Sequence, residues 1–181
     1  MDTPPLPRRK SIRLPAYDYA QNGAYFVTIC LKPRLPLLAQ IAEADVGAGP
    51  RPARTLLSPL GAIVEHTWTD LPKHNPGLVL GPFVVMPDHI HGILILEGRA
   101  GLGPAPTALP ELMRQFKGFS ARRANQLRGT PGAPFWQRGY YDHIIRNQQD
   151  FDQTAAYILG NPARWADGSK TDLDFGGRRA P

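Results

Sequence analysis

The sequence has a single cysteine, Cys30, and no apolar run long enough to span a membrane. One thiol cannot form a disulfide within a chain, and in the apolar run from Tyr25 to Leu31 it more often packs as a small hydrophobe than reacts. The basic residues between Arg8 and Arg13 are not followed by the apolar stretch of a signal peptide. We therefore expect a cytoplasmic protein with no membrane-spanning segment.

Acidic residues are outnumbered by basic ones. The 181 residues include 21 Lys and Arg against 15 Asp and Glu, which gives a formal net charge of +6. A positive surface favours a polyanionic partner such as nucleic acid, although many small proteins are basic without one. Hydrophobic residues make up 42% of the chain, so we expect one domain around its own core.

Composition divides the chain into three parts. Residues 1–20 hold several prolines and the basic cluster, and they predict an extended arm that either contacts phosphates or serves as a solubilising tail. Residues 21–165 are the expected folded domain, with Gly- and Pro-rich surface loops at 46–53 and 98–106. Residues 166–181 are expected to form a polar C-terminal tail.

Hydrophobic periodicity predicts four strands and three helices. The strands are expected at 24–31, 78–86, 89–96 and 140–146, and the helices at 59–71, 110–127 and 148–160, the last ending before Pro162. Ser58 is the expected cap of the first helix, and Gly129 follows the end of the second. Strand, helix, strand, strand, helix, strand is the split βαβ order of ferredoxin-like folds. The predicted fold class is therefore α+β: an antiparallel sheet with helices on one face, plus an appended C-terminal helix, which leaves the other face free for a ligand.

Two histidines lie two residues apart in the strand predicted at 89–96. Because side chains alternate along a strand, His89 and His91 project from the same face. Their spacing, about 6.6 Å along the strand, suits two imidazole nitrogens binding one metal ion at about 2.1 Å. On its own, a His-x-His pattern is more typical of structural or surface histidines. The preceding apolar strand and the Pro-Asp break place both imidazoles just inside a sheet, with no cysteine nearby for a structural zinc, and this context favours a functional metal site. Borderline ions such as manganese, zinc or nickel would accept the two ligands.

A tyrosine occupies an unusual position on the last predicted helix. The apolar residues Phe151, Ala155, Ile158 and Leu159 form one stripe, and helical geometry puts Tyr157 on the opposite, polar side. Asn161 follows one turn later, so its side-chain oxygen can stand beside the phenol as a third metal ligand or a phosphate anchor. Partly exposed tyrosines are common on helices, and Asn161 is also a reasonable helix terminator.

Five segments of the chain together resemble the REP-associated tyrosine transposases, which belong to the single-tyrosine HUH transposase superfamily. The similar segments are Arg9–Leu14, Ala24–Cys30, Met86-Pro87-Asp88-His89-Ile90-His91-Gly92, Trp136–Asn147 and Tyr157–Pro162. The likeness covers most of residues 8–165, and its motifs are specific in combination.

The resemblance implies a ferredoxin-like domain that cleaves and rejoins single-stranded DNA. It implies that His89, His91 and Asn161 bind Mg²⁺ or Mn²⁺, and that Tyr157 attacks a DNA phosphate to leave a 5′-phosphotyrosine link. The implied substrates are repeated extragenic palindromes (REP elements), which fold as hairpins from single strands. The protein is expected to work as a monomer or a homodimer. Gly160 and the loop at 98–106 depart from the pattern without removing a proposed catalytic group.

Several basic and aromatic residues are candidate DNA contacts. The basic candidates are Arg114, Lys117, Arg122, Arg123, Arg138 and Arg146, and the candidate stacking surfaces are Trp136, Tyr140 and Tyr141. As a set they predict DNA binding that weakens steeply with added salt. His143 is a secondary candidate, either as a DNA contact or as a hydrogen-bonded structural histidine.

Two other functions compete with the transposase interpretation. The same strand order builds non-catalytic modules that stack single-stranded bases on sheet aromatics, although here histidines occupy the comparable face. A metal-dependent phosphodiester hydrolase would use the same histidines to activate water and would leave no covalent adduct.

Overall fold

The structure is a computed structural model that describes residues 22–42, 53–97 and 107–168. The predicted arm at 1–20, the loop at 98–106 and most of the loop at 46–53 and of the tail at 166–181 lie outside these residues. The strands are β1 (Gly23–Cys30), β2 (Ala39–Ala42), β3 (Arg54–Leu57), β4 (Leu78–Val85), β5 (His89–Leu96) and β6 (Tyr141–Ile145). The helices are α1 (Pro59–Thr69), α2 (Leu71–His74), α3 (Leu109–Arg128) and α4 (Gln148–Ala166). None of the described helices is both long and apolar enough to cross a bilayer.

Four of the strands form one antiparallel sheet in the order β4-β5-β1-β6. This is the split βαβ topology predicted from the order of elements, so the α+β, ferredoxin-like fold class is confirmed. The predicted cap of α1 is confirmed as well, because the Ser58 hydroxyl accepts from the Gly61 N–H at 3.1 Å. Gly129 ends α3 in the left-handed conformation, with φ of 66°.

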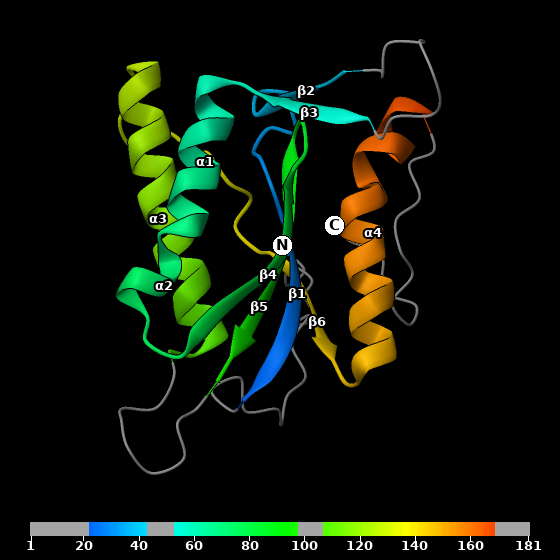
Figure 1. Ribbon diagram of the computed structural model, residues 1–181. Coiled ribbons are helices and arrows are strands. Elements are labelled where there is room, and N and C mark those ends of the chain that lie inside the picture. The colour runs from blue at the N-terminus through cyan, green and yellow to red at the C-terminus, as the bar shows by residue number, and fades with distance from the viewer. Residues whose placement is uncertain (1–21, 43–52, 98–106, 169–181) are drawn as a thin grey trace, which may run out of the picture.

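Helices cover both faces of the sheet (Figure 1). α1 and α3 pack on one face against a core that includes Tyr25, Val27 and Ile29 of β1. α4 packs on the other face, where Tyr157 and Ile158 join a second apolar cluster. The expectation of a free second face is therefore wrong. β1 is apolar at nearly every position, and a strand of that kind needs cover on both sides.

The last helix also runs further than predicted. α4 continues through Pro162 to Ala166 instead of ending before the proline. Proline has no N–H, so the carbonyl four residues earlier loses its usual helical donor, which is a local cost. Helical hydrogen bonding then resumes, because the Asp167 N–H donates to the Ala163 carbonyl at 3.1 Å. The additional turn carries Arg164 and Trp165 into the region of the histidines.

A small second sheet was not predicted from the sequence. β2 and β3 pair antiparallel, with Ala39 opposite Leu57 and Ala42 opposite Arg54. Each strand has only four residues, AQIA and RTLL, and neither sequence alternates apolar and polar residues for long enough to predict a strand.

Gly92, directly after the histidine pair, is required by close packing. A Cβ built on it would stand 2.4 Å from the Trp68 ring and 3.1 Å from Phe83. We therefore expect Gly92→Ala to lower the free energy of unfolding by about 2 to 3 kcal/mol in urea denaturation, as overpacked cores do. Gly118→Ala is the control, since no atom outside its own stretch of helix lies within 4 Å of its Cβ position. An unchanged free energy for Gly92→Ala would show that the Trp68 ring can move aside.

Candidate active site

His89 and His91 face each other on the side of the sheet that α4 covers. Their Nε2 atoms are 3.1 Å apart, and the two residues are 6% and 5% exposed. Register places His91 opposite Thr28 and His89 opposite Cys30 in β1, so both imidazoles stand at the centre of the sheet. The sequence prediction that the pair shares one face and converges is confirmed.

Each histidine is held from its other ring nitrogen. Asp88 Oδ1 lies 2.5 Å from His89 Nδ1, and the Thr28 hydroxyl lies 2.8 Å from His91 Nδ1. Arg34 extends the first contact by donating to Asp88 Oδ2 at 2.9 Å. Partners of this kind fix the ring orientation of metal-binding histidines, so both Nε2 atoms are aimed at a common point.

The electrostatics keep Asp88 ionised and His91 neutral. Burial raises the pKa of Asp88, but hydrogen bonds with His89 and Arg34 outweigh it and bring the pKa down to about 2. Since an ionised carboxylate only accepts, the proton in the contact between the two residues belongs to His89 Nδ1. Burial, with the nearby charges of His89 and Arg34, lowers the pKa of His91 well below its ordinary value. The Thr28 hydroxyl both donates and accepts, so it can serve either neutral tautomer of His91.

The two imidazoles fit a divalent metal ion, but they do not complete its coordination. Ligands about 2.1 Å from an ion and about 90° to 110° apart are separated by about 3.0 to 3.4 Å, close to the observed Nε2 separation. Among the described residues, no group of three or more His, Cys, Asp or Glu side chains could hold a metal ion. In the part of the chain that the structure describes, amide or hydroxyl oxygens remain as further ligands, and water or a phosphate can add to them; magnesium and manganese accept oxygen donors of this kind.

Tyr157 lies beside the histidines, on the face of α4 opposite to the predicted one. Its ring centroid is 5.3 Å from that of His91 and 6.1 Å from that of Phe26, and the residue is 7% exposed. Leu159, predicted to face the core, is 67% exposed. The prediction of a polar, exposed position for Tyr157 is therefore wrong, although the predicted proximity of the phenol to the histidines is confirmed.

The last turns of α4 bind the backbone of Tyr157. Arg164 Nη2 donates to the Tyr157 carbonyl at 2.7 Å, and the guanidinium carbon lies 4.7 Å from the centroid of the Tyr157 ring. The Asn161 amide nitrogen is 3.5 Å from the same carbonyl. The side-chain oxygen of Asn161 makes no hydrogen bond with the residues that the structure describes. Trp165, on the next turn, has its ring centroid 5.9 Å from that of His89.

His143 is tied to the start of α4 and not to the histidine pair. Its Nε2 lies 3.0 and 3.1 Å from the two carboxylate oxygens of Asp150. Asp150 Oδ2 also accepts from the backbone N–H of Arg146 at 3.0 Å. These contacts connect the end of β6 to the first turn of α4 and correspond to the structural alternative considered for His143.

Lys117, predicted as a phosphate contact, binds backbone instead. Its Nζ donates to the carbonyls of Gln137, Arg138 and Gly139 at 2.7, 2.9 and 3.1 Å. Burial lowers the pKa of Lys117. We expect Lys117→Met to lower the free energy of unfolding by about 1 to 2 kcal/mol in urea denaturation, since three carbonyls lose a charged donor. An unchanged unfolding free energy would show that water replaces the ammonium at no cost.

The other predicted basic contacts fall into two places. Three of them line a hollow on the side of the sheet that α1 and α3 cover, and two are exposed near the ends of β6. The first group is Arg114, Arg122 and Arg123, and the second is Arg138 and Arg146. The structure therefore does not bring the predicted basic residues together at the histidine pair.

Several residues of the site are absent from the sequence prediction. Thr28, Arg34 and Arg164 each contact a histidine, its carboxylate partner or Tyr157. Thr28 could have been found, since it is a polar residue at the alternate position of an otherwise apolar strand. Arg164 lies two helical turns after Tyr157, but that spacing was hidden by the prediction that the helix stops before Pro162.

The fold and this cluster define a ferredoxin-like α+β protein with paired imidazoles and a tyrosine enclosed between the sheet and its last helix. The chain belongs to the same family as an uncharacterized protein of Haemophilus influenzae (strain ATCC 51907 / DSM 11121 / KW20 / Rd). The two are 34% identical over 175 residues, which cover 87% of this chain and 89% of that protein. No protein family model matches the chain.

The fold is also that of a solved transposase. A REP-associated tyrosine transposase, whose structure was determined bound to a REP hairpin, superposes with a TM-score of 0.57 at 19% sequence identity. The similarity covers 93% of this chain and 99% of that one. The resemblance drawn from the motifs is therefore confirmed at the level of the fold.

Proposed function

We propose that this protein is a transposase-type enzyme that cleaves and rejoins single-stranded DNA at hairpin sites through a covalent link to Tyr157. The observation that carries the proposal is the convergence of two imidazole Nε2 atoms, 3.1 Å apart, next to the Tyr157 ring. The fold of a hairpin-binding transposase and the motifs around His89, His91 and Tyr157 support it.

The proposed chemistry assigns a role to each group in the cluster. His89 and His91, with the Asn161 oxygen as a third donor, would hold Mg²⁺ or Mn²⁺. The bound ion supplies Lewis acidity toward the scissile phosphate. Tyr157 Oη releases its proton to solvent and forms the new bond to phosphorus while the bond to the 3′ oxygen breaks, and that oxygen takes a proton from solvent and leaves as a hydroxyl. Attack by a free 3′-hydroxyl on the phosphotyrosine reverses the step and rejoins DNA.

Arg164 is a positioning residue for the attacking phenol. Its hydrogen bond to the Tyr157 carbonyl fixes the backbone that carries the nucleophile, and its charge lies over the ring. A cation there favours the negative charge that the phenol oxygen acquires as it gives up its proton.

Arg164→Met is expected to lower the single-turnover rate of adduct formation by about 100-fold, as the loss of one preorganised charge typically does. The DNA concentration at half-saturation should change by less than about threefold, because Arg164 is assigned to the chemical step and not to strand binding. Arg164→Lys keeps the charge and should recover part of the rate. Equal losses in rate and affinity, with no recovery by lysine, would assign Arg164 to helix structure alone.

Access to the cluster requires movement. His89, His91 and Tyr157 are all less than one-tenth exposed. A DNA strand therefore reaches the phenol only after the site opens.

The test is a covalent trapping experiment. The protein is incubated with a single-stranded oligonucleotide that contains a hairpin and flanking bases, with Mn²⁺ or with EDTA, and is then separated on a denaturing gel. The proposal predicts a metal-dependent protein–DNA adduct that peptide mass spectrometry maps to Tyr157. Cleaved DNA without an adduct would indicate a hydrolase, and tight binding with neither product would indicate a non-catalytic module.

A further inference from the structure

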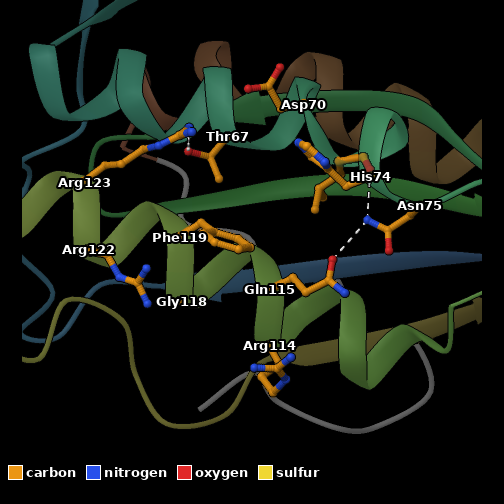
Figure 2. A pocket seen from close by; sticks show the side chains of 11 residues that line it. Thr67, Asp70, His74, Asn75, Arg114, Gln115, Gly118, Phe119, Arg122 and Arg123 are labelled. Carbon is orange, nitrogen blue, oxygen red and sulfur yellow. Dashed lines mark hydrogen bonds between the residues drawn. The ribbon is translucent and has the colours of Figure 1, made fainter.

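The face of the sheet away from the histidines carries a second candidate site. A hollow of about 560 Å³ lies between α1 and α2 on one side and α3 on the other (Figure 2). Its size falls in the range of small-molecule sites, about 300 to 1,000 Å³. Since α1 and α3 cover one face and α4 covers the other, the sheet separates this hollow from Tyr157 (Figure 1).

The hollow carries positive charge that its own acidic neighbours do not neutralise. Glu111 is paired with Arg114 at 2.6 Å, and Asp70 is paired with Lys73 at 2.7 Å. Arg122 and Arg123 form no ion pair with any residue that the structure describes, although Arg123 Nη1 donates to the Thr67 hydroxyl at 3.3 Å and its charge is felt by Asp70. Both guanidinium groups keep further N–H donors for an anion, and they suit phosphate because they can bind its oxygens in pairs.

An exposed aromatic ring lies beside these charges. Phe119 is 50% exposed, and the Arg122 guanidinium lies 5.9 Å from the centroid of its ring. Gly118, the preceding residue, has no atom within 4 Å of its Cβ position, so the space beside the helix is open. An aromatic ring next to an arginine is a typical stacking surface for a nucleobase.

Two side-chain amides, of Asn75 and Gln115, also line the hollow. Asn75 Nδ2 donates to Gln115 Oε1 at 3.1 Å, as Figure 2 shows. Asn75 Nδ2 also donates to the Leu71 carbonyl at 2.9 Å, and Gln115 Nε2 donates to Glu111 Oε1 at 3.1 Å, so these amides hold the wall of the hollow together. An acidic peptide would match the arginines but would not require the exposed ring of Phe119.

We propose that this hollow holds one unpaired nucleotide of a DNA strand, with its base stacked on Phe119 and its phosphate bound by Arg122 and Arg123. The inference rests on the proposed function, because the nucleotide belongs to the same DNA molecule that reacts. It lies in a single-stranded part of that DNA that does not enter the histidine site. The hollow is far from the reacting atoms. It therefore contributes to DNA affinity and placement, and it leaves the rate of the chemical step at saturating DNA unchanged.

The first test measures DNA affinity by fluorescence anisotropy, in EDTA, with the full chain carrying Tyr157→Phe so that no DNA is cleaved. Phe119→Ala should weaken binding of a hairpin oligonucleotide with single-stranded flanks by about tenfold. Arg122→Gln should reduce the slope of log affinity against log salt by about one. Leu127→Ala, an exposed apolar residue of α3 outside the hollow, and Arg54→Gln on β3 are the matched controls and should stay within about twofold of the parent.

The second test locates the base directly. Oligonucleotides with 5-iodouracil at successive single-stranded positions are irradiated with the protein, and the cross-linked peptide is sequenced. One position should cross-link to the peptide that contains Phe119. Cross-links confined to other peptides, or equal loss of affinity in the control variants, would overturn the proposal. Competition by polyglutamate as effective as that by an oligonucleotide would also overturn it, in favour of an acidic peptide.

The two proposals fail separately. If a Tyr157 adduct forms while Phe119→Ala and Arg122→Gln bind DNA like the parent, the nucleotide site is wrong and the proposed chemistry stands. If both variants weaken binding while no adduct forms under any metal condition, the nucleotide site stands and the proposed chemistry is wrong.

Discussion

Tyr157→Phe is expected to abolish covalent attachment to DNA while the protein continues to bind the oligonucleotide. The substitution removes only the attacking oxygen. The ring keeps its contacts with Phe26, His91 and Arg164, so we expect the free energy of unfolding to change by less than about 1 kcal/mol. Adduct yield on a denaturing gel should fall below detection, and the DNA dissociation constant should stay within about threefold.

Tyr141→Phe provides the matched control for this prediction. Tyr141 is also buried on the α4 side of the sheet, with its ring centroid 6.2 Å from that of Phe26. It belongs to the same apolar cluster as Tyr157 but has no ring contact with His91 among those of the described residues. The control should form the adduct like the parent. An adduct that persists in Tyr157→Phe, or that disappears only in Tyr141→Phe, would assign the nucleophile to another residue.

Strand alternation is the part of the site that local sequence determines. A residue and its neighbour two positions along must share one face of a strand, so the shared face of His89 and His91 follows from their spacing. The same rule puts Ile90 and Gly92 on the opposite face, against the core under α1 and α3. The order of strands and helices could likewise be predicted from the sequence. Each strand of the main sheet is strongly apolar, and α1 and α3 have typical capping residues, Ser58 and Gly129.

The orientation of α4 could not be predicted from hydrophobic periodicity. Periodicity assumes that the buried face of a helix is the apolar one. The buried face of α4 instead includes Thr154 and Tyr157, because it meets the polar imidazoles as well as the apolar cluster. Leu159 is left exposed by the same rotation. The departure from an ordinary amphipathic pattern thus occurs at the residues to which we assign chemistry, where local rules are expected to fail.

The contacts that orient the histidines could not be predicted either, since they join residues far apart in the chain. Thr28 and His91 are 63 positions apart, and Arg34 and Asp88 are 54 apart. Both contacts depend on the pairing of β1 with β5, which sequence order suggests but does not align residue by residue. The resemblance supplied the identities of the histidines and the tyrosine, whereas the residues that hold them required the three-dimensional structure.

His91→Gln is expected to remove the response of the protein to divalent metal as well as its activity. In the parent, Mn²⁺ at about 100 times its dissociation constant should stabilise the folded state by about 2.7 kcal/mol, visible as a higher melting temperature that EDTA reverses. Replacing His91 leaves one imidazole ligand, so we expect the affinity of the protein for the metal ion to fall strongly. Adduct formation should fall by about 1,000-fold, because the phosphate loses the charge that stabilises its transition state.

His143→Gln is the control for the metal prediction, since His143 is a histidine of the same face of the sheet that is engaged with Asp150. It should keep both the metal-dependent rise in melting temperature and the adduct. If Mn²⁺ still raises the melting temperature of His91→Gln, the ion binds elsewhere in the protein. If the parent forms the adduct in EDTA as fast as in Mn²⁺, the histidine pair acts without a metal, as a hydrogen-bonding group for the phosphate beside Tyr157.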